Sequence, residues 1–209
     1  MIETIFIIFL VCFIFIFKYL YYNEVCYVEA FDSQTYLVRN LPDKDNAAQM
    51  LGDLRNKLLN FVDVLVENIE QEAMSIPKDD NKDSKEDEDL KEYYKYVKMI
   101  QKKLPNSIIK ESSANSEYTS YSINKGEELV FCLRSKIDNK LHNINEIMYV
   151  AIHEIAHIGC PEIGHTPLFK KINKFLLEQA VKKNLYIYSD YKRNNKEYCG
   201  INLTSTILD

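Results

Sequence analysis

The sequence lacks the cysteine patterns that staple small extracellular domains or build structural zinc sites. Its five cysteines are scattered over positions 12, 26, 132, 160 and 199, and no two of them form a CxxC pair. Neither a disulfide framework nor a CxxC zinc pair can therefore be read from their spacing. This absence agrees with a domain that faces the cytosol.

The sequence also lacks an excess of basic residues. The chain of 209 residues has a net charge of −5, and its acids are concentrated between Asp79 and Glu92. A generally basic surface of the kind that binds nucleic acid is therefore excluded, and no nucleic-acid partner is predicted. The balance is basic from Thr166 onward, which leaves a local basic patch near the C-terminus open. No repeat at a solenoid period is present. The length and the 46% hydrophobic content instead allow one packed domain with an appendage.

A long apolar run, MIETIFIIFLVCFIFIFKYLYY, stands at the N-terminus. About 20 such residues cross the hydrocarbon core of a bilayer, and the run has neither a basic start nor a small-x-small cleavage site. An uncleaved transmembrane anchor over residues 1–22 is therefore favoured over a signal peptide. Glu3 precedes the span and Lys18 follows it, which by the positive-inside rule predicts a single-pass membrane protein with a cytosolic domain.

The remaining chain has the pattern of an α+β domain over residues 45–209, joined to the anchor by a membrane-proximal segment, 23–44, with short strands. Apolar residues recur at helical spacing in 51–69 and 90–104. The acidic stretch 78–89 between them has no apolar period, which favours a solvated loop.

Two strand-like runs flank the turn Asn124-Lys-Gly-Glu127, in which the glycine suits a position of positive φ. They predict a hairpin that leads towards the next helix. A short β-prone tail follows the last helix of the chain. We therefore expect a small antiparallel sheet.

The stretch HEIAHIGCPEIGH, from His153 to His165, holds three of the four histidines of the chain. An Asn143 cap predicts a helix through His157, in which His153 and His157 project from one face and can share a tetrahedral ion. Zinc suits neutral imidazole ligands. Glu154 lies about 100° around the helix, beside the metal, where it can take a proton from a metal-activated water.

A third ligand would leave one coordination position for water and substrate. His165 is favoured, because Thr166 and Pro167 supply the N-cap and first turn of another helix and so fix its position. Three other donors stay open as alternatives: Glu178, Glu162 and Cys160. The fourth histidine, His142, precedes the helix and is expected to be an ordinary surface residue.

Two segments resemble the WLM metalloprotease family, zincins related to the SprT-like and YgjP-like proteins. One is SINKGEELVFCLRS, with an Asn-x-Gly turn and a strand ending in Leu-Arg; the other is HEIAHIGCPEIGHTPLFKKINKFLL, with HExxH followed by a further histidine and a phenylalanine. With the helix between them they cover about residues 118–182. Together with VRNLPDKDNAAQMLGDLR and DYKRNNKEYCG, the arrangement is similar to membrane-anchored WLM-domain proteins of large DNA viruses. The loop before the third histidine is longer than in many members.

The resemblance implies a zincin-like, membrane-anchored zinc metallopeptidase that acts on a protein or peptide substrate. It implies one Zn²⁺ held by His153, His157 and His165, with Glu154 as general base. Some WLM proteins cut proteins attached to DNA, but the anchor and the acidic balance argue against carrying this substrate over.

A tyrosine could help to stabilise the oxyanion of the reaction, and Tyr191 and Tyr198 are the candidates. The motif also leaves open metal-dependent hydrolysis of a bond other than a peptide bond. The main alternative function is that of a zinc-stabilised binding protein or virion structural protein without catalysis. Glu154 disfavours this alternative, because a purely structural metal site needs no base at that position.

Overall fold

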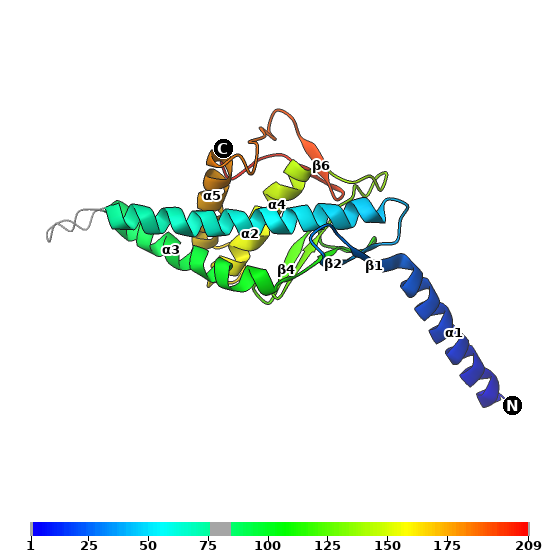
Figure 1. Cartoon of the computed structure of the whole chain (residues 1–209). Helices are drawn as coiled ribbons and strands as arrows, with labels where there is room; N and C mark the ends of the chain where they lie inside the picture. Colours follow the sequence, from blue (N-terminus) through cyan, green and yellow to red (C-terminus); the bar gives the residue numbers. More distant parts are fainter. Residues whose placement is uncertain (1, 76–84, 209) are drawn as a thin grey trace.

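A mixed β-sheet covered by helices forms the body of the computed structural model, which describes residues 2–75 and 85–208 (Figure 1). The helices are α1 (Ile2–Glu24), α2 (Lys44–Ser75), α3 (Lys85–Lys103), the short 3-10 helix η1 (Leu104–Asn106), α4 (Ile144–Gly159) and α5 (Pro167–Lys182). The strands are β1 (Val25–Glu29), β2 (Thr35–Arg39), β3 (Ile108–Glu111), β4 (Tyr121–Ile123), β5 (Glu128–Phe131), β6 (Lys196–Tyr198) and β7 (Ile201–Leu203). The predicted α+β class is confirmed.

The main sheet has five strands in the order β1-β2-β3-β5-β4, and β6 pairs with β7 in a separate hairpin. The strands expected in 23–44 are β1 and β2, which are antiparallel, as are β4 and β5. However, β3 is parallel to both β2 and β5, so the prediction of an antiparallel sheet is wrong at these two pairings. Parallel neighbours need a long crossover connection, which α2 and α3 supply between β2 and β3.

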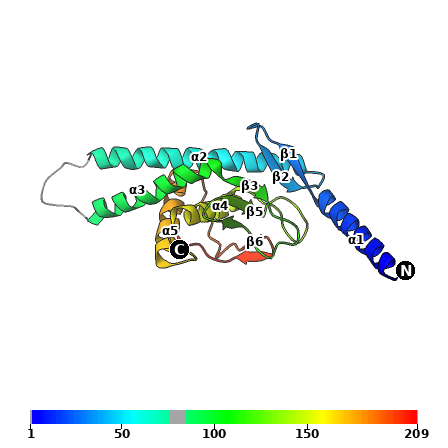
Figure 2. The same ribbon diagram turned by 90° about the horizontal axis from the view of Figure 1, so that it is seen from below.

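The helices α2 and α3 run side by side, as both ribbon views show (Figure 2). The predicted apolar stripe of α2 is buried, with Leu51, Leu54, Leu58 and Leu65 all 2% exposed or less. α2 packs on β1, β2 and β3, whereas α4 packs on β4 and β5. Their buried residues belong to one hydrophobic cluster, so the position of α4 is set by its packing on the sheet and on the neighbouring helices α2, α3 and α5.

Helix α3 begins at Lys85, so the last part of the acidic stretch 78–89 is helical. The expected loop is therefore wrong for 85–89, and residues 76–84 lie outside the described part of the chain. The start of α3 contacts a residue of α5, which is distant in the chain, so local periodicity does not reveal this contact. Lys171 of α5 contacts the carboxylates of Asp89 and Glu92 at 2.7 and 2.8 Å.

The N-terminal helix α1 extends away from the sheet in both views, and its apolar side chains from Ile5 to Phe17 are exposed (Figures 1 and 2). Within the residues described, none of the helices combines the length and the hydropathy needed to cross a membrane. The transmembrane anchor predicted over residues 1–22 is not supported by this finding.

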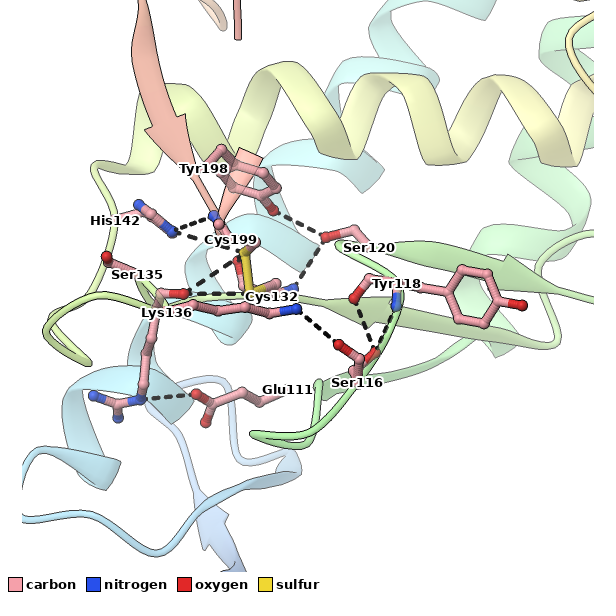
Figure 3. The surroundings of a disulfide bond; sticks show 12 residues. Glu111, Ser116, Tyr118, Ser120, Cys132, Ser135, Lys136, His142, Tyr198 and Cys199 are labelled. Atoms are coloured by element: carbon pink, nitrogen blue, oxygen red, sulfur yellow. Dashed lines mark hydrogen bonds and ion pairs between the residues drawn. A yellow bond between two sulfur atoms is a disulfide. The ribbon is translucent and has the colours of Figure 1, made fainter. Parts of the chain in front are cut away.

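Cys132 and Cys199 form a disulfide that ties the end of β5 to the turn of the β6–β7 hairpin (Figure 3). The spacing of the cysteines did not reveal this bridge, because 67 positions separate its two cysteines in the chain. His142 is buried beside this bridge and accepts a hydrogen bond from the Cys199 backbone N–H at 3.2 Å, so it is not a surface residue. The disulfide removes the support that scattered cysteines gave to a cytosolic domain.

Arg134, at the Leu-Arg end of the second hairpin strand, is buried between two carboxylates. Its guanidinium donates to Glu111 at 2.8 Å and to Asp43 at 2.7 Å. Burial raises the pKa of Glu111, although hydrogen bonds from the Arg39 backbone and from Arg134 act in the opposite direction. The ion pair therefore joins the end of β3, the start of α2 and the segment after β5.

Replacing Arg134 with Met should cost about 3–5 kcal/mol of unfolding free energy, because it leaves the Glu111 carboxylate buried without a counter-charge. The double variant Arg134→Met, Glu111→Gln should recover part of this loss. Urea unfolding of the wild type and both variants measures it. A single variant within about 0.5 kcal/mol of wild type would contradict the structural role of the pair.

The disulfide predicts three free thiols in the unreduced chain, from Cys12, Cys26 and Cys160. Thiol titration in denaturant and peptide mapping without reductant should find these three and a linked Cys132–Cys199 peptide. Closure of a loop of this length contributes about 4 kcal/mol in the chain-entropy model, so reduction should lower the free energy of unfolding. Five reactive thiols would contradict the bridge.

Candidate metal centre

Helix α4 presents His153 and His157 from its last turns. It starts after Asn143, whose side chain accepts a hydrogen bond from the Asn145 backbone N–H at 2.8 Å, as the predicted cap requires. The opposite stripe of α4 is fully buried through Met148, Ala151, Ile152 and Ile155. The two histidines are only partly buried and therefore face away from the core.

His165 reaches the same place from the loop after α4. Thr166 caps α5 by accepting a hydrogen bond from the Phe169 backbone N–H at 3.2 Å, and Pro167 begins the helix as expected. The Nε2 atoms of His153 and His165 are 3.0 Å apart. One ring nitrogen from each of the three histidines lies within 4.8 Å of the others. The structure thus brings together the three imidazoles that the sequence suggests as ligands.

Phe169 packs against all three imidazole rings from the first turn of α5. Its ring stacks on His157 with centroids 4.1 Å apart and meets the edges of His153 and His165 at 4.9 Å. In the sequence, Phe169 is noted only as the phenylalanine that follows the third histidine in the WLM-like segment. Its position four residues after His165 is the signal that could have revealed this contact. The phenylalanine limits how the rings can turn.

The surroundings of His153 and His157 keep their imidazole rings in the neutral form that binds metal ions. Burial, with the neighbouring imidazoles, lowers the pKa of His153 to about 4, and burial likewise lowers that of His157 to about 4. Both rings are therefore neutral near pH 7 and keep a lone pair for coordination. A set of three imidazoles fits Zn²⁺, which catalytic sites hold with three protein ligands.

Glu154 lies on the adjacent face of α4 and is only 4% exposed. Burial raises its pKa to about 8, and a hydrogen bond from the Ser122 backbone opposes the rise. A cation at the three histidines would favour the carboxylate form. A buried carboxyl group beside a metal site has the position and the tunable proton affinity of a general base.

The histidines and Glu154 line a cleft of about 780 Å³. One wall is formed by residues 118–122, which include part of β4, and another by the loop 162–165. The β6–β7 hairpin closes a further side with Tyr198, Ile201 and Leu203. The histidine cluster is therefore accessible to a ligand that lies along β4.

The structure separates the two candidate tyrosines. Tyr198 lines the cleft, and its hydroxyl shares a hydrogen bond with Ser120 at 2.9 Å (Figure 3). Tyr191 is buried elsewhere, with its ring 5.4 Å from that of Tyr149, and it does not line the cleft. Of the two candidates, only Tyr198 reaches the site, because it lies on the β6–β7 hairpin, and sequence alone does not reveal that placement.

The three alternative ligands lie apart from the histidine cluster. Glu178 is exposed on α5 and does not line the cleft. Glu162 lines the cleft but its carboxylate is not part of the group of ligand atoms, and the free thiol of Cys160 is buried where α4 ends.

No family model matches the sequence. The crystal structure of Wss1 from Saccharomyces cerevisiae aligns with a TM-score of 0.33 and 15% identity over 48% of this chain and 84% of that chain. A mutant of Wss1 gives a TM-score of 0.34 over 52% of this chain and 90% of that chain. Likeness at this level is too weak to support any conclusion about this protein.

Three viral proteins are similar in sequence. Protein 136R of Invertebrate iridescent virus 6 is 38% identical over 38% of this chain and 44% of its own length. Protein 042R of Invertebrate iridescent virus 3 is 35% identical over 39% of this chain and 50% of its own. Uncharacterized protein R325 of Acanthamoeba polyphaga mimivirus is 34% identical over 187 residues, which cover 89% of this chain and 86% of R325. At this identity and coverage, the chain belongs to the same family as R325.

Proposed function

We propose that the protein is a zinc-dependent metallopeptidase that hydrolyses peptide bonds, with Glu154 as its general base. The observation that carries the proposal is the meeting of three imidazole nitrogens within 4.8 Å at a cleft, next to a buried carboxyl group. When bound by His153, His157 and His165, Zn²⁺ supplies a Lewis acid that polarises a carbonyl group and lowers the pKa of water.

The remaining steps belong to the side chains around the cluster. Glu154 accepts the proton of the attacking water and then passes it to the leaving amine. Burial raises the pKa of Tyr198, so its hydroxyl keeps its proton at neutral pH and can donate a hydrogen bond to a developing oxyanion. Ser120 holds that hydroxyl at the edge of the cleft.

An extended polypeptide is the substrate that suits the cleft. β4 is an edge strand of the main sheet and pairs on one side with β5. Its other edge belongs to the wall formed by 118–122, so a substrate strand can pair there and carry its peptide bond past the histidines. Attachment to a membrane and a cytosolic location stay predictions from the sequence and are no part of this proposal.

A non-catalytic zinc site does not need the carboxyl group of Glu154. Burying a carboxyl group costs free energy, as the rise of its pKa to about 8 reflects, and three histidines can hold zinc without it. A binding or structural protein would keep its zinc site with an apolar residue at this position. The position of Glu154 therefore favours catalysis.

The wild-type protein should contain about one zinc ion per chain, and Glu154→Gln should keep the metal while peptidase activity falls by about 100-fold or more. Metal analysis and cleavage of an unfolded protein substrate measure the two quantities. Glu178→Gln, which removes an exposed carboxylate outside the cleft, is the matched control and should behave as wild type.

Each outcome points to a different part of the proposal. A wild-type protein without zinc would overturn the metal site. Zinc with unchanged cleavage in Glu154→Gln would overturn the mechanism. The same variant, incubated with extracts and recovered with bound proteins, offers a route to the natural substrate once activity is established.

His165→Ala should weaken zinc binding by more than about 100-fold, because it removes a direct ligand rather than a supporting contact. Glu178→Ala should leave the affinity unchanged. Competition with a chromogenic chelator measures both dissociation constants. An equal affinity in the wild type and in His165→Ala would show that another residue completes the site.

A further inference from the structure

The loop that delivers His165 has little burial of its own. Residues 161–165 are all exposed, so packing does not fix the path of the chain between α4 and the third histidine. A segment of this kind opens easily unless other contacts hold it. A metal ligand, by contrast, must be held within a fraction of an ångström of its place.

Lys125, in the turn between β4 and β5 at the lining of the cleft, supplies such a contact. Its ammonium group donates a hydrogen bond to the carbonyl of Cys160 at 2.5 Å and another to the carbonyl of Glu162. Cys160 caps the end of α4, and Glu162 lies two residues further along. One side chain therefore ties the end of α4 to the start of the loop that leads to His165.

The backbone of Lys125 is itself held in place. It lies in the turn between β4 and β5, where Asn124, Lys125 and Gly126 have φ values of 48°, 59° and 95°. The Gly126 carbonyl accepts a hydrogen bond from the Ser107 hydroxyl at 2.5 Å. A Cβ at Gly126 would lie 2.7 Å from Cδ1 of Ile158, so the turn is docked directly on the last turn of α4. Non-glycine residues adopt positive φ at a cost that the surroundings must offset.

The charge of Lys125 cannot explain its presence beside a metal site. The lysine adds to the fall in the pKa of His157 by repelling the protonated ring, and it would repel a divalent cation by the same physics. If electrostatics were its main effect, removing the lysine would tighten metal binding. If its hydrogen bonds to the loop were the main effect, removing it would weaken metal binding.

We propose that Lys125 is a positioning residue, which fixes the loop 160–164 so that His165 meets His153 and His157 at one metal site. The inference rests on the proposed metal site and extends it to a residue outside the HExxH segment. Supporting residues of this kind typically change metal affinity by about 10- to 100-fold.

The test compares zinc affinity in Lys125→Met, Lys125→Arg and the wild-type chain by competition with a chromogenic chelator. Lys125→Met keeps the length of the side chain but removes its donors, and should weaken zinc binding by about 10-fold or more. Lys125→Arg keeps the charge and the donors and should recover part of the affinity. Lys174→Met, which removes an exposed lysine of α5 outside the cleft, is the control and should match wild type.

A second readout follows the coordination itself. With Co²⁺ in place of zinc, the visible spectrum of Lys125→Met should shift towards that of His165→Ala, while the thermal midpoints of the metal-free proteins show whether the fold is intact. Unchanged or tighter zinc binding in Lys125→Met, or a wild-type cobalt spectrum, would overturn the inference.

The two proposals fail in different ways. A wild-type protein that binds zinc but cuts no peptide would contradict the proposed function, and the affinity of Lys125→Met would still decide the role of the lysine. A wild-type protein that binds neither zinc nor Co²⁺ would contradict both.

Discussion

The contact between the last turn of α4 and the first turn of α5 is the constraint on which the site depends. Phe169 touches all three imidazoles across this contact, stacking on His157 at 4.1 Å. It can do so because Thr166 starts α5 directly after His165 and the buried stripe of α4 fixes the other helix. The positions of His153, His157 and Phe169 therefore follow from helix packing, and a metal ion would enter a site whose ligands are already near one another.

The same region contains buried or partly buried ionisable groups that lower the free energy of unfolding and that the proposed reaction uses. Glu154 is almost completely buried, and two partly buried histidines are held in their neutral form with pKa values of about 4. A fold tolerates such groups when the rest of the core is well packed, as the apolar residues of α2, α4 and α5 are here. The strained turn at Lys125 follows this pattern, since its positive φ stands where a side chain reaches the metal loop.

The cleft depends on parts of the chain that lie far apart in sequence. β4 forms one wall because β5, held by β3, gives it a place at the sheet edge. The β6–β7 hairpin forms another wall because the Cys132–Cys199 disulfide and the hydrogen bond between Ser120 and Tyr198 attach it to that sheet (Figure 3). A two-stranded hairpin is marginal by itself, so these attachments decide where Tyr198 stands.

The sequence by itself determined the local features of this protein. The apolar period of α2, the Asn143 and Thr166 caps, the turn at Gly126 and the two histidines one helical turn apart all depend on residues within a few positions of one another. Such features can be read from spacing, because helix and turn geometry repeat over short distances.

Only the tertiary structure decided the remaining features. The parallel pairings of β3, the helical start of α3 beside Lys171, the burial of His142 and the disulfide each join residues that are distant in the chain. The choice of Tyr198 over Tyr191 at the cleft has the same origin. Spacing along the chain contains no record of such contacts, because they depend on how whole elements pack, and packing is a property of the folded chain.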